Sequence, residues 1–291
     1  MDIKKVMVVG CGTMGSGIVQ VCAQSGLQVV MTDVSQQMLE KAMEKIAWSV
    51  GKLAEKGKIA DDQATVMARI TASQDYAPGA DANLVVEAVF ESIEVKKEVF
   101  GALEKAVSPK CLLASNTSAI PISAIGGGLE HPERILGLHF FNPVPMLDAV
   151  EVIKGISTSE ETMQAGVDFV RYLGKEPIRV DSDIAGFILN RCNMLLNMEA
   201  YRLVEQKVST PKDIDTGFRL AFGRKMGPLE TSDLVGLDVQ LMAYTNVYDE
   251  EKDPRFYPPS ILRRKVEAGH LGRKTGKGWY EYDKDGKRID S

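Results

Sequence analysis

The chain has 291 residues, 44% of them hydrophobic and 26% charged, and a formal net charge of -5. This length exceeds the usual size of a single hydrophobic core, so two domains are expected. The acidic balance gives no reason to expect nucleic acid as a partner, and no stretch approaches the length of a membrane span.

The cysteines and histidines are scattered along the chain. The four cysteines form no CxxC pair, and there are only three histidines, so we predict no metal site. The first residues lead straight into a strand pattern and lack the apolar core of a signal peptide. These features predict reduced thiols and a cytoplasmic location.

A dinucleotide-binding pattern opens the chain. Residues Lys5–Val9 form an apolar run typical of a buried parallel strand, and the turn Gly10-Cys11-Gly12-Thr13-Met14-Gly15 follows directly. A helical pattern then runs from Ser16 to Ser25. Residues 28–32 predict a second strand, which leads into Asp33. This order of strand, GxGxxG, helix, strand and acid indicates a site for a dinucleotide, whereas an isolated GxGxxG could be only a glycine-rich turn.

Each part of this pattern has a physical reason. Gly10 permits a tight turn, Gly12 lets the backbone approach a pyrophosphate, and Gly15 lets the helix pack on the strand. The helix N-terminus presents N–H groups to the phosphates. Asp33 can accept hydrogen bonds from ribose hydroxyls and would repel a 2′-phosphate, which favours NAD over NADP.

A long helix is expected from Ser35 to Lys56. On it Ser49, Lys52 and Lys56 share one face. This face could bind the phosphates of a bulky substrate, or it could simply be solvated.

The next strong strand pattern covers Asp81–Val89 and is followed by Glu91. Ligands of open α/β sheets bind outside the carboxyl ends of the strands. Glu91, with Lys96 further along, is therefore a candidate contact for the nicotinamide end of the cofactor. The helix expected at Ile93–Val107 leaves the alternative that Lys96 is a surface lysine.

A buried strand at Lys110–Ala114 leads into the polar run Ser115-Asn116-Thr117-Ser118. Small polar side chains at the carboxyl end of a strand suit recognition of a hydroxyl or carbonyl group. The alternative is a polar turn with no ligand.

A candidate acid–base pair follows. His139 lies near the end of the strand pattern Ile135–Phe141, and Glu151 lies in a second extended run, Ala149–Ile153. Two strands joined by the Pro-rich turn at 142–145 could bring the two side chains face to face. A histidine titrates near neutral pH, and a carboxylate on its second nitrogen fixes the tautomer. The alternative is a core histidine beside an exposed glutamate.

The pattern changes after residue 183, beyond which no strand signal remains. We expect an α/β fold, with a Rossmann-type, mostly parallel sheet domain at residues 1–183 and an all-α C-terminal domain at 184–291. The C-terminal domain is expected to form a homodimer interface. Asn190, early in its first helix, could reach a cleft or lie at the surface. The basic, glycine-rich tail at 272–280 could fold over a phosphate or be a flexible end.

The remaining expected elements connect these features. They are helices at 61–69, 160–173, 184–207, 211–222, 237–248 and 260–268, and strands at 70–73 and 176–180.

Several motifs together resemble the 3-hydroxyacyl-CoA dehydrogenase family over nearly the full length. They are the glycine turn, Leu84-Val85-Val86-Glu87-Ala88, Ala114-Ser115-Asn116-Thr117-Ser118, the run from Gly137 to Pro145, Met226-Gly227-Pro228 and Gly272-Arg273-Lys274-Thr275-Gly276. The resemblance implies oxidation of a 3-hydroxyacyl-CoA, such as 3-hydroxybutyryl-CoA, with NAD.

The resemblance also implies roles for individual residues. His139 matches the catalytic base, Glu151 its carboxylate partner, and Ser118 and Asn190 the side chains that position the substrate oxygen. Ser49 and Lys56 match contacts to CoA, and Ser118 and Asn190 also contact substrate. The expected cofactor contacts are Gly10, Gly12, Thr13, Met14, Gly15, Asp33, Glu91, Lys96, Asn116, Ser118, Asn142 and Lys274.

Two positions depart from the family pattern. Asp148 stands where a basic residue is common, and Trp279 replaces a more usual phenylalanine. The alternative functions are a related sugar-acid dehydrogenase, such as one acting on gulonate, and a catalytically silent NAD-binding protein. Acyl chain length and direction, fatty-acid oxidation or reduction toward butyrate, stay open.

Overall fold

The computed structural model describes residues 3–289. The chain divides into two compact units between Ile184 and Ala185. The predicted domain boundary, after residue 183, lies one residue from this division.

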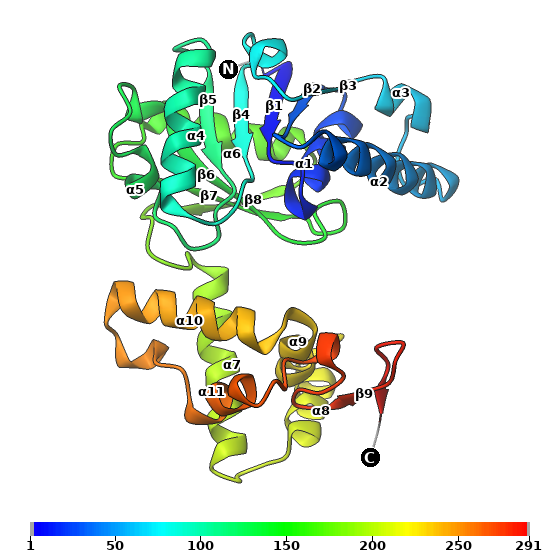
Figure 1. The fold of residues 1–291 in the computed structure, drawn as a ribbon, viewed down its shortest axis with the longest axis vertical. Coiled ribbons are helices and arrows are strands. Elements are labelled where there is room, and N and C mark those ends of the chain that lie inside the picture. The colour runs from blue at the N-terminus through cyan, green and yellow to red at the C-terminus, as the bar shows by residue number, and fades with distance from the viewer. Residues whose placement is uncertain (1–2, 290–291) are drawn as a thin grey trace. The chain divides into compact units, whose positions relative to one another are not determined.

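An eight-stranded sheet with the order β3-β2-β1-β4-β5-β6-β7-β8 organises the first unit (Figure 1). Neighbouring strands run parallel except for β6 and β7, which are antiparallel. The expected Rossmann-type, mostly parallel sheet is thus confirmed. The strands are β1 (Lys5–Val9), β2 (Gln28–Thr32), β3 (Ile70–Ser73), β4 (Leu84–Glu87), β5 (Leu112–Ser115), β6 (Ile135–Phe140), β7 (Ala149–Ile153) and β8 (Glu176–Val180).

Helices cover both faces of this sheet. They are α1 (Thr13–Gln24), α2 (Gln36–Glu55), α3 (Gln63–Met67), α4 (Ile93–Ala106), α5 (Ile122–Gly126) and α6 (Glu160–Tyr172). Helices α1, α2 and α6 share one core with Leu136, Leu138 and Phe140 of β6. Gly137 instead faces Ile122 of α5. Because side chains alternate along a strand, His139 points to the same face as Gly137.

The first unit differs from the sequence predictions at one strand and at one additional helix. The predicted strand over Asp81–Val89 is shorter, and β4 ends at Glu87. There the Glu87 carboxylate accepts a hydrogen bond from the Val89 backbone N–H at 2.7 Å, which replaces a strand-to-strand bond. The short helix α5 was not predicted.

The second unit is mainly helical, as expected. It contains α7 (Leu189–Glu205), α8 (Pro211–Phe222), α9 (Pro228–Val235), α10 (Leu237–Glu251), α11 (Ser260–Glu267) and a small antiparallel pair, β9 (Glu281–Tyr282) and β10 (Arg288–Ile289). Helix α7 begins later than the predicted residue 184 because Gly186 and Phe187 have φ of 76° and 47°, outside the helical region. Helix α9 and the small strand pair were not predicted.

The glycine-rich tail is packed. The Asp233 carboxylate accepts hydrogen bonds from the backbone N–H groups of Trp279 and Tyr280 at 2.8 and 2.9 Å and from the Tyr282 hydroxyl at 3.0 Å. Gly272 and Gly278 have no room for a Cβ beside Asp233. The alternative of a flexible end is therefore wrong for this segment.

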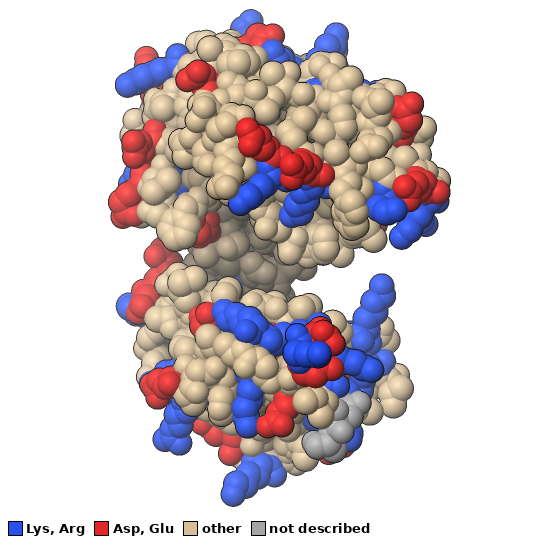
Figure 2. All heavy atoms as spheres, turned by 45° about the vertical axis from the view of Figure 1, so that its right-hand side comes forward, with Lys and Arg blue, Asp and Glu red and all other residues tan. Residues whose placement is uncertain are grey.

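Charged side chains of both signs are interspersed on the visible face of the first unit (Figure 2). Among residues 3–289, no helix has both the length and the apolar character required to cross a membrane.

Candidate active site

His139 and Glu151 form a buried pair at the carboxyl end of β6. The antiparallel register of β6 and β7 places the two residues directly opposite each other. The His139 Nδ1 lies 2.7 Å from the Glu151 Oε2, and only 5% of His139 and none of Glu151 is exposed. The ring of Phe141 lies 4.5 Å from that of His139. The expected face-to-face pairing is confirmed, and the alternative with an exposed glutamate is wrong.

This geometry determines the tautomer. A carboxylate only accepts hydrogen bonds, so Nδ1 must carry a proton. The acceptor lone pair of a neutral His139 then lies on Nε2. The pair can therefore take up one proton at Nε2, with the Glu151 carboxylate stabilising the imidazolium.

Glu91 anchors the polar loop that follows β5. Its Oε1 accepts hydrogen bonds from the Thr117 hydroxyl at 2.6 Å, the Ser118 backbone N–H at 3.0 Å and the Ala119 backbone N–H at 3.3 Å. The Ser118 hydroxyl lies 3.4 Å from the same oxygen. The structure thus brings together two predicted site residues, Glu91 and Ser118. The polar run after β5 is thus a loop anchored by Glu91, and its contact with a ligand stays a prediction.

The charge state of Glu91 follows from its neighbours. Burial of the carboxyl raises its pKa, but the Lys96 ammonium and the hydrogen bonds from Thr117 and Ser118 outweigh burial and hold the pKa below its usual value. Glu91 is therefore ionised at neutral pH.

Lys96 is buried, with 1% of its surface exposed, so the alternative of a surface lysine is wrong. Its Nζ lies 2.7 Å from Glu87 Oε1 and 3.2 Å from Glu91 Oε2. The Ser115 hydroxyl donates to the other Glu87 oxygen at 2.7 Å. Sequence reasoning had missed Glu87 as a member of this site. An acid at the end of an apolar strand was the available signal.

Asn116 links this loop to the His139 strand. Its Oδ1 accepts a hydrogen bond from the backbone N–H of Phe140 at 2.9 Å. The Asn116 side-chain nitrogen takes no part in this hydrogen bond. A loop carrying two predicted cofactor contacts, Asn116 and Ser118, is thereby held beside the acid–base pair.

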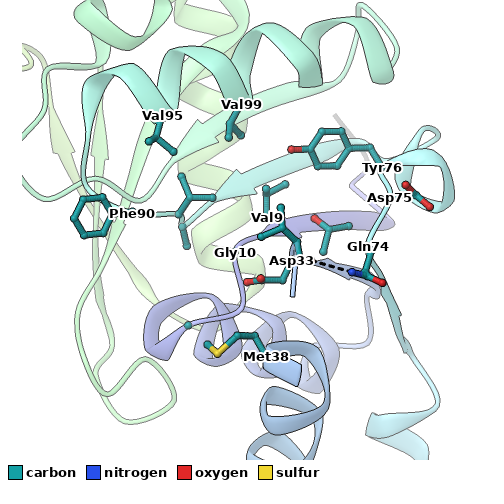
Figure 3. Close-up of a pocket in the computed structure, with 15 residues that line it drawn as sticks. Val9, Gly10, Asp33, Met38, Gln74, Asp75, Tyr76, Phe90, Val95 and Val99 are labelled. Carbon is teal, nitrogen blue, oxygen red and sulfur yellow. Dashed lines mark hydrogen bonds between the residues drawn. The ribbon is translucent and has the colours of Figure 1, made fainter. Parts of the chain in front are cut away.

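The glycine turn borders a cavity of about 810 Å³ (Figure 3). Asp33, Met38, Tyr76 and Phe90 are among the residues that line it. Gly10 has a φ of +90°, and a Cβ there would lie 2.7 Å from the Ala88 carbonyl oxygen, so only glycine fits.

The residues present fit a dinucleotide. A Cβ built on Gly12 would meet no atom within 4 Å, so the turn is open on that side. Gly12 also precedes α1 without a side-chain cap, which leaves N–H groups of the first turn, at Thr13 and Met14, for phosphates. A Cβ at Gly15 would overlap the Gly10 carbonyl, which explains the third glycine.

A buried lysine supports the turn between β6 and β7. Lys175 donates to the carbonyl oxygens of Val144 at 2.8 Å and Leu147 at 2.7 Å. Burial lowers the pKa of this lysine, and the Asp148 charge partly opposes that effect. Asp148, which departs from the family pattern, thus has a cation near it. The sequence analysis did not single out Lys175. Asn142, a predicted cofactor contact, lies exposed on the turn between β6 and β7.

Ser49 lines a second cavity, of about 160 Å³, together with Asn142 and Met146. Gln20 of α1 also lines this cavity and is 3% exposed, and its Nε2 has no hydrogen-bond partner among the described residues. Lys56 follows the end of α2 and is exposed. Lys52, on the same face, pairs with Glu55 at 2.8 Å.

Two predicted site residues belong to the second unit. Asn190 lies in the first turn of α7 and is partly buried. Lys274 pairs with Asp238 at 2.6 Å within that unit. Their roles toward substrate and cofactor stay predictions.

The fold and site define an NAD-binding oxidoreductase of the dehydrogenase class. A family model described as "3-hydroxyacyl-CoA dehydrogenase, NAD binding domain" matches residues 5–184, and one described as "3-hydroxyacyl-CoA dehydrogenase, C-terminal domain" matches residues 186–282. The chain belongs to the 3-hydroxyacyl-CoA dehydrogenase family. The predicted family and the predicted cofactor, NAD, are confirmed.

Similar proteins cover nearly the whole chain. A probable 3-hydroxybutyryl-CoA dehydrogenase of Deinococcus radiodurans is 42% identical over 96% of this chain and 100% of its own length. The crystal structure of (S)-3-hydroxybutyryl-CoA dehydrogenase PaaH1 from Ralstonia eutropha has a TM-score of 0.93 at 38% identity, covering 97% of this chain and 100% of that one. A 3-hydroxyadipyl-CoA dehydrogenase of Escherichia coli is 37% identical over 97% of this chain and 60% of its own length. These names support the hydroxyacyl-CoA prediction over the sugar-acid alternative.

Proposed function

We propose that this protein interconverts 3-hydroxybutyryl-CoA and acetoacetyl-CoA, using NAD. The observation that carries the proposal is the buried His139–Glu151 pair, at the same carboxyl edge of the sheet as the glycine turn. When bound, NAD would accept the hydride from C3 of the substrate.

In this mechanism His139 Nε2 takes the proton of the 3-hydroxyl group. Glu151 holds Nδ1 and stabilises the imidazolium that forms. Ser118, on the loop that Glu91 anchors, would hold the substrate oxygen as it becomes a ketone, and the family resemblance gives Asn190 the same role. In the reverse direction His139 returns the proton, so the same pair acts as acid and base.

The CoA part of the substrate occupies the side of α2. Ser49 lines the small cavity beside the turn that follows the His139 strand. The Gln20 Nε2, which has no hydrogen-bond partner among the described residues, offers a donor for a carbonyl of the pantetheine arm. Lys56, exposed beyond the end of α2, suits a CoA phosphate.

The first test is the loss of NADH absorbance when acetoacetyl-CoA is added to enzyme with NADH. Rapid loss is expected. Substitution of His139 by Gln should lower turnover about 100- to 10,000-fold, because a positioned acid–base group contributes that much, and NADH binding should be unchanged.

His131→Gln is the matched control, because His131 also pairs with a glutamate, Glu133 at 3.4 Å, but 42% of its side chain is exposed, so turnover should not change. Near-normal turnover of His139→Gln would contradict the mechanism. No loss of NADH in the wild-type protein would instead favour the sugar-acid or the catalytically silent alternative.

We also propose that the enzyme is cytoplasmic and that its substrate is an acyl-CoA. Among the described residues the four cysteines are unpaired, and three of them are buried.

Activity with a series of 3-oxoacyl-CoA chain lengths would define the acyl preference, because relatives of similar identity carry names for different acyl groups.

A further inference from the structure

The Asp33 carboxylate is fixed through both of its oxygens. Oδ2 accepts hydrogen bonds from the Cys11 backbone N–H at 3.0 Å and from the Cys11 thiol at 3.2 Å. Oδ1 accepts from the Ser35 backbone N–H at 3.0 Å. Rotation of the carboxylate away from the cavity would break these bonds. Cys11 lies between the first two glycines of the turn, and the sequence analysis gave it no role. These hydrogen bonds connect it to Asp33, which directly follows β2.

The Cys11 thiol is suited to act as a donor. Only 3% of Cys11 is exposed. Burial raises the pKa of the thiol to about 12, and the Asp33 carboxylate acts in the same direction. The thiol is therefore protonated at neutral pH and can donate to Asp33.

The charge of the cavity adds a second observation. Asp33 and Asp75 both line it, and no Lys or Arg is among its described lining residues. Val34, directly after Asp33, is 91% exposed and offers no cation. A 2′-phosphate beside Asp33 would face carboxylates, and a fixed Asp33 could not turn away from it.

We infer that Cys11 is a positioning residue that holds Asp33 for the ribose hydroxyls and makes the site select NAD against NADP. These three hydrogen bonds leave one acceptor site of the carboxylate, on Oδ1, which would accept a ribose hydroxyl. The selectivity thus depends on the thiol as well as on Asp33. This inference concerns cofactor binding only, so it can hold or fail independently of the acyl-CoA substrate.

The test compares dissociation constants for NADH and NADPH, measured by fluorescence titration of the full chain without substrate. Cys11→Ala should weaken NADH binding about three- to tenfold, the size of one hydrogen bond. NADPH binding should weaken less or improve, so the NADH:NADPH selectivity falls. Cys11→Ser keeps a donor and should restore most of the selectivity.

Cys22→Ala is the matched control. Cys22 is also buried, and burial raises the pKa of its thiol to about 12, but this thiol lies in the hydrophobic core and, among the described residues, makes no hydrogen bond to Asp33. Loss of this thiol should leave the selectivity unchanged even if it lowers stability.

A double-mutant cycle separates positioning from general damage. In an Asp33→Asn background, the difference between Cys11→Ser and Cys11→Ala should shrink, because a neutral amide oxygen is a weaker acceptor than a carboxylate. The inference is overturned if Cys11→Ala binds both cofactors like wild type or weakens both equally. It is also overturned if Cys11→Ser behaves like Cys11→Ala. If Cys11→Ala does not fold, Cys11→Ser and Asp33→Asn still test the inference. Wild-type selectivity in Cys11→Ser that is lost when Asp33→Asn is added would support the inference. A loss of selectivity in Cys11→Ser itself would overturn it.

Discussion

At the scale of single residues, one carboxylate combines an observed structural role with a predicted binding role. Glu91 is a predicted cofactor contact, and it also holds the backbone N–H groups of Ser118 and Ala119. Lys96, fixed by Glu87 from the other side, keeps Glu91 charged. If the predicted cofactor contact holds, binding and local stability are coupled at this position, because the same ionised group would support both.

The coupling predicts a pH-dependent effect of Glu91→Gln on the free energy of unfolding. The pKa of Glu91 is lower in the folded protein than its usual value of 4.5. Its contribution to stability is therefore complete above pH 4.5 and is lost as the pH falls through the lower, folded value. Glu91→Gln should be less stable than wild type at pH 7, and the difference should shrink below about pH 4.5.

Urea unfolding between pH 3.5 and 7 measures this difference. Glu44→Gln, an exposed position on α2, is the control and should show none. A Glu91→Gln penalty that stays constant over the whole pH range would contradict the assignment of an ionised anchor.

At the scale of elements, the turn between β6 and β7 depends on a residue from a distant part of the chain. Lys175 lies between α6 and β8 and donates to two carbonyl groups of the turn. The turn also packs against α1, where a Cβ at Gly17 would lie 2.8 Å from Val144. The shape of the turn that carries Asn142 therefore depends on α1 and on the segment between α6 and β8, and not on the Pro-rich sequence alone.

Lys175→Met should reduce the free energy of unfolding by about 2–4 kcal/mol, because two buried carbonyls lose their donor. The Michaelis constant for NADH should rise as the turn loosens. Equilibrium denaturation and steady-state kinetics measure the two effects. Lys105→Met, at an exposed site on α4, should change neither. Unchanged stability of Lys175→Met would show that the turn holds its shape without this lysine.

At the scale of the whole molecule, the second unit exposes large apolar side chains. Leu220 and Phe222 at the end of α8 are 83% and 72% exposed, and Met242 of α10 is 61% exposed. Exposed apolar surface of this kind is typical of a subunit interface. It supports the prediction of a homodimer through residues 184–291.

Sedimentation equilibrium at micromolar concentration should therefore give twice the chain mass of 31.8 kDa. Phe222→Glu should shift the protein toward monomer, because a charge would be buried in the interface. Lys212→Glu, a charge change on the same helix, serves as the comparison for a general charge effect. A monomeric wild-type protein would refute the dimer.

Much of the fold was predictable because it is encoded in contiguous residues. Strand β7 and helix α8 have the predicted bounds, and the glycine turn lies between β1 and α1 as expected. Periodicity and turn residues act locally, so the sequence alone reveals them. The opposition of His139 and Glu151 was also predictable, because a short turn connects their two strands.

The partners of buried charges were decided by tertiary structure alone. The helical pattern left open whether Lys96 is a cofactor contact or a surface residue, yet its ammonium is buried beside Glu87 of β4. Cys11 and Asp33 are 22 positions apart in the sequence. Lys175 is 31 and 28 positions from Val144 and Leu147, whose carbonyl groups accept its hydrogen bonds. Such contacts depend on strand order and register, which bring distant segments together and which no local pattern specifies. The sequence by itself determined the class of fold and the acid–base pair, and the packing of the sheet determined what holds the site in place.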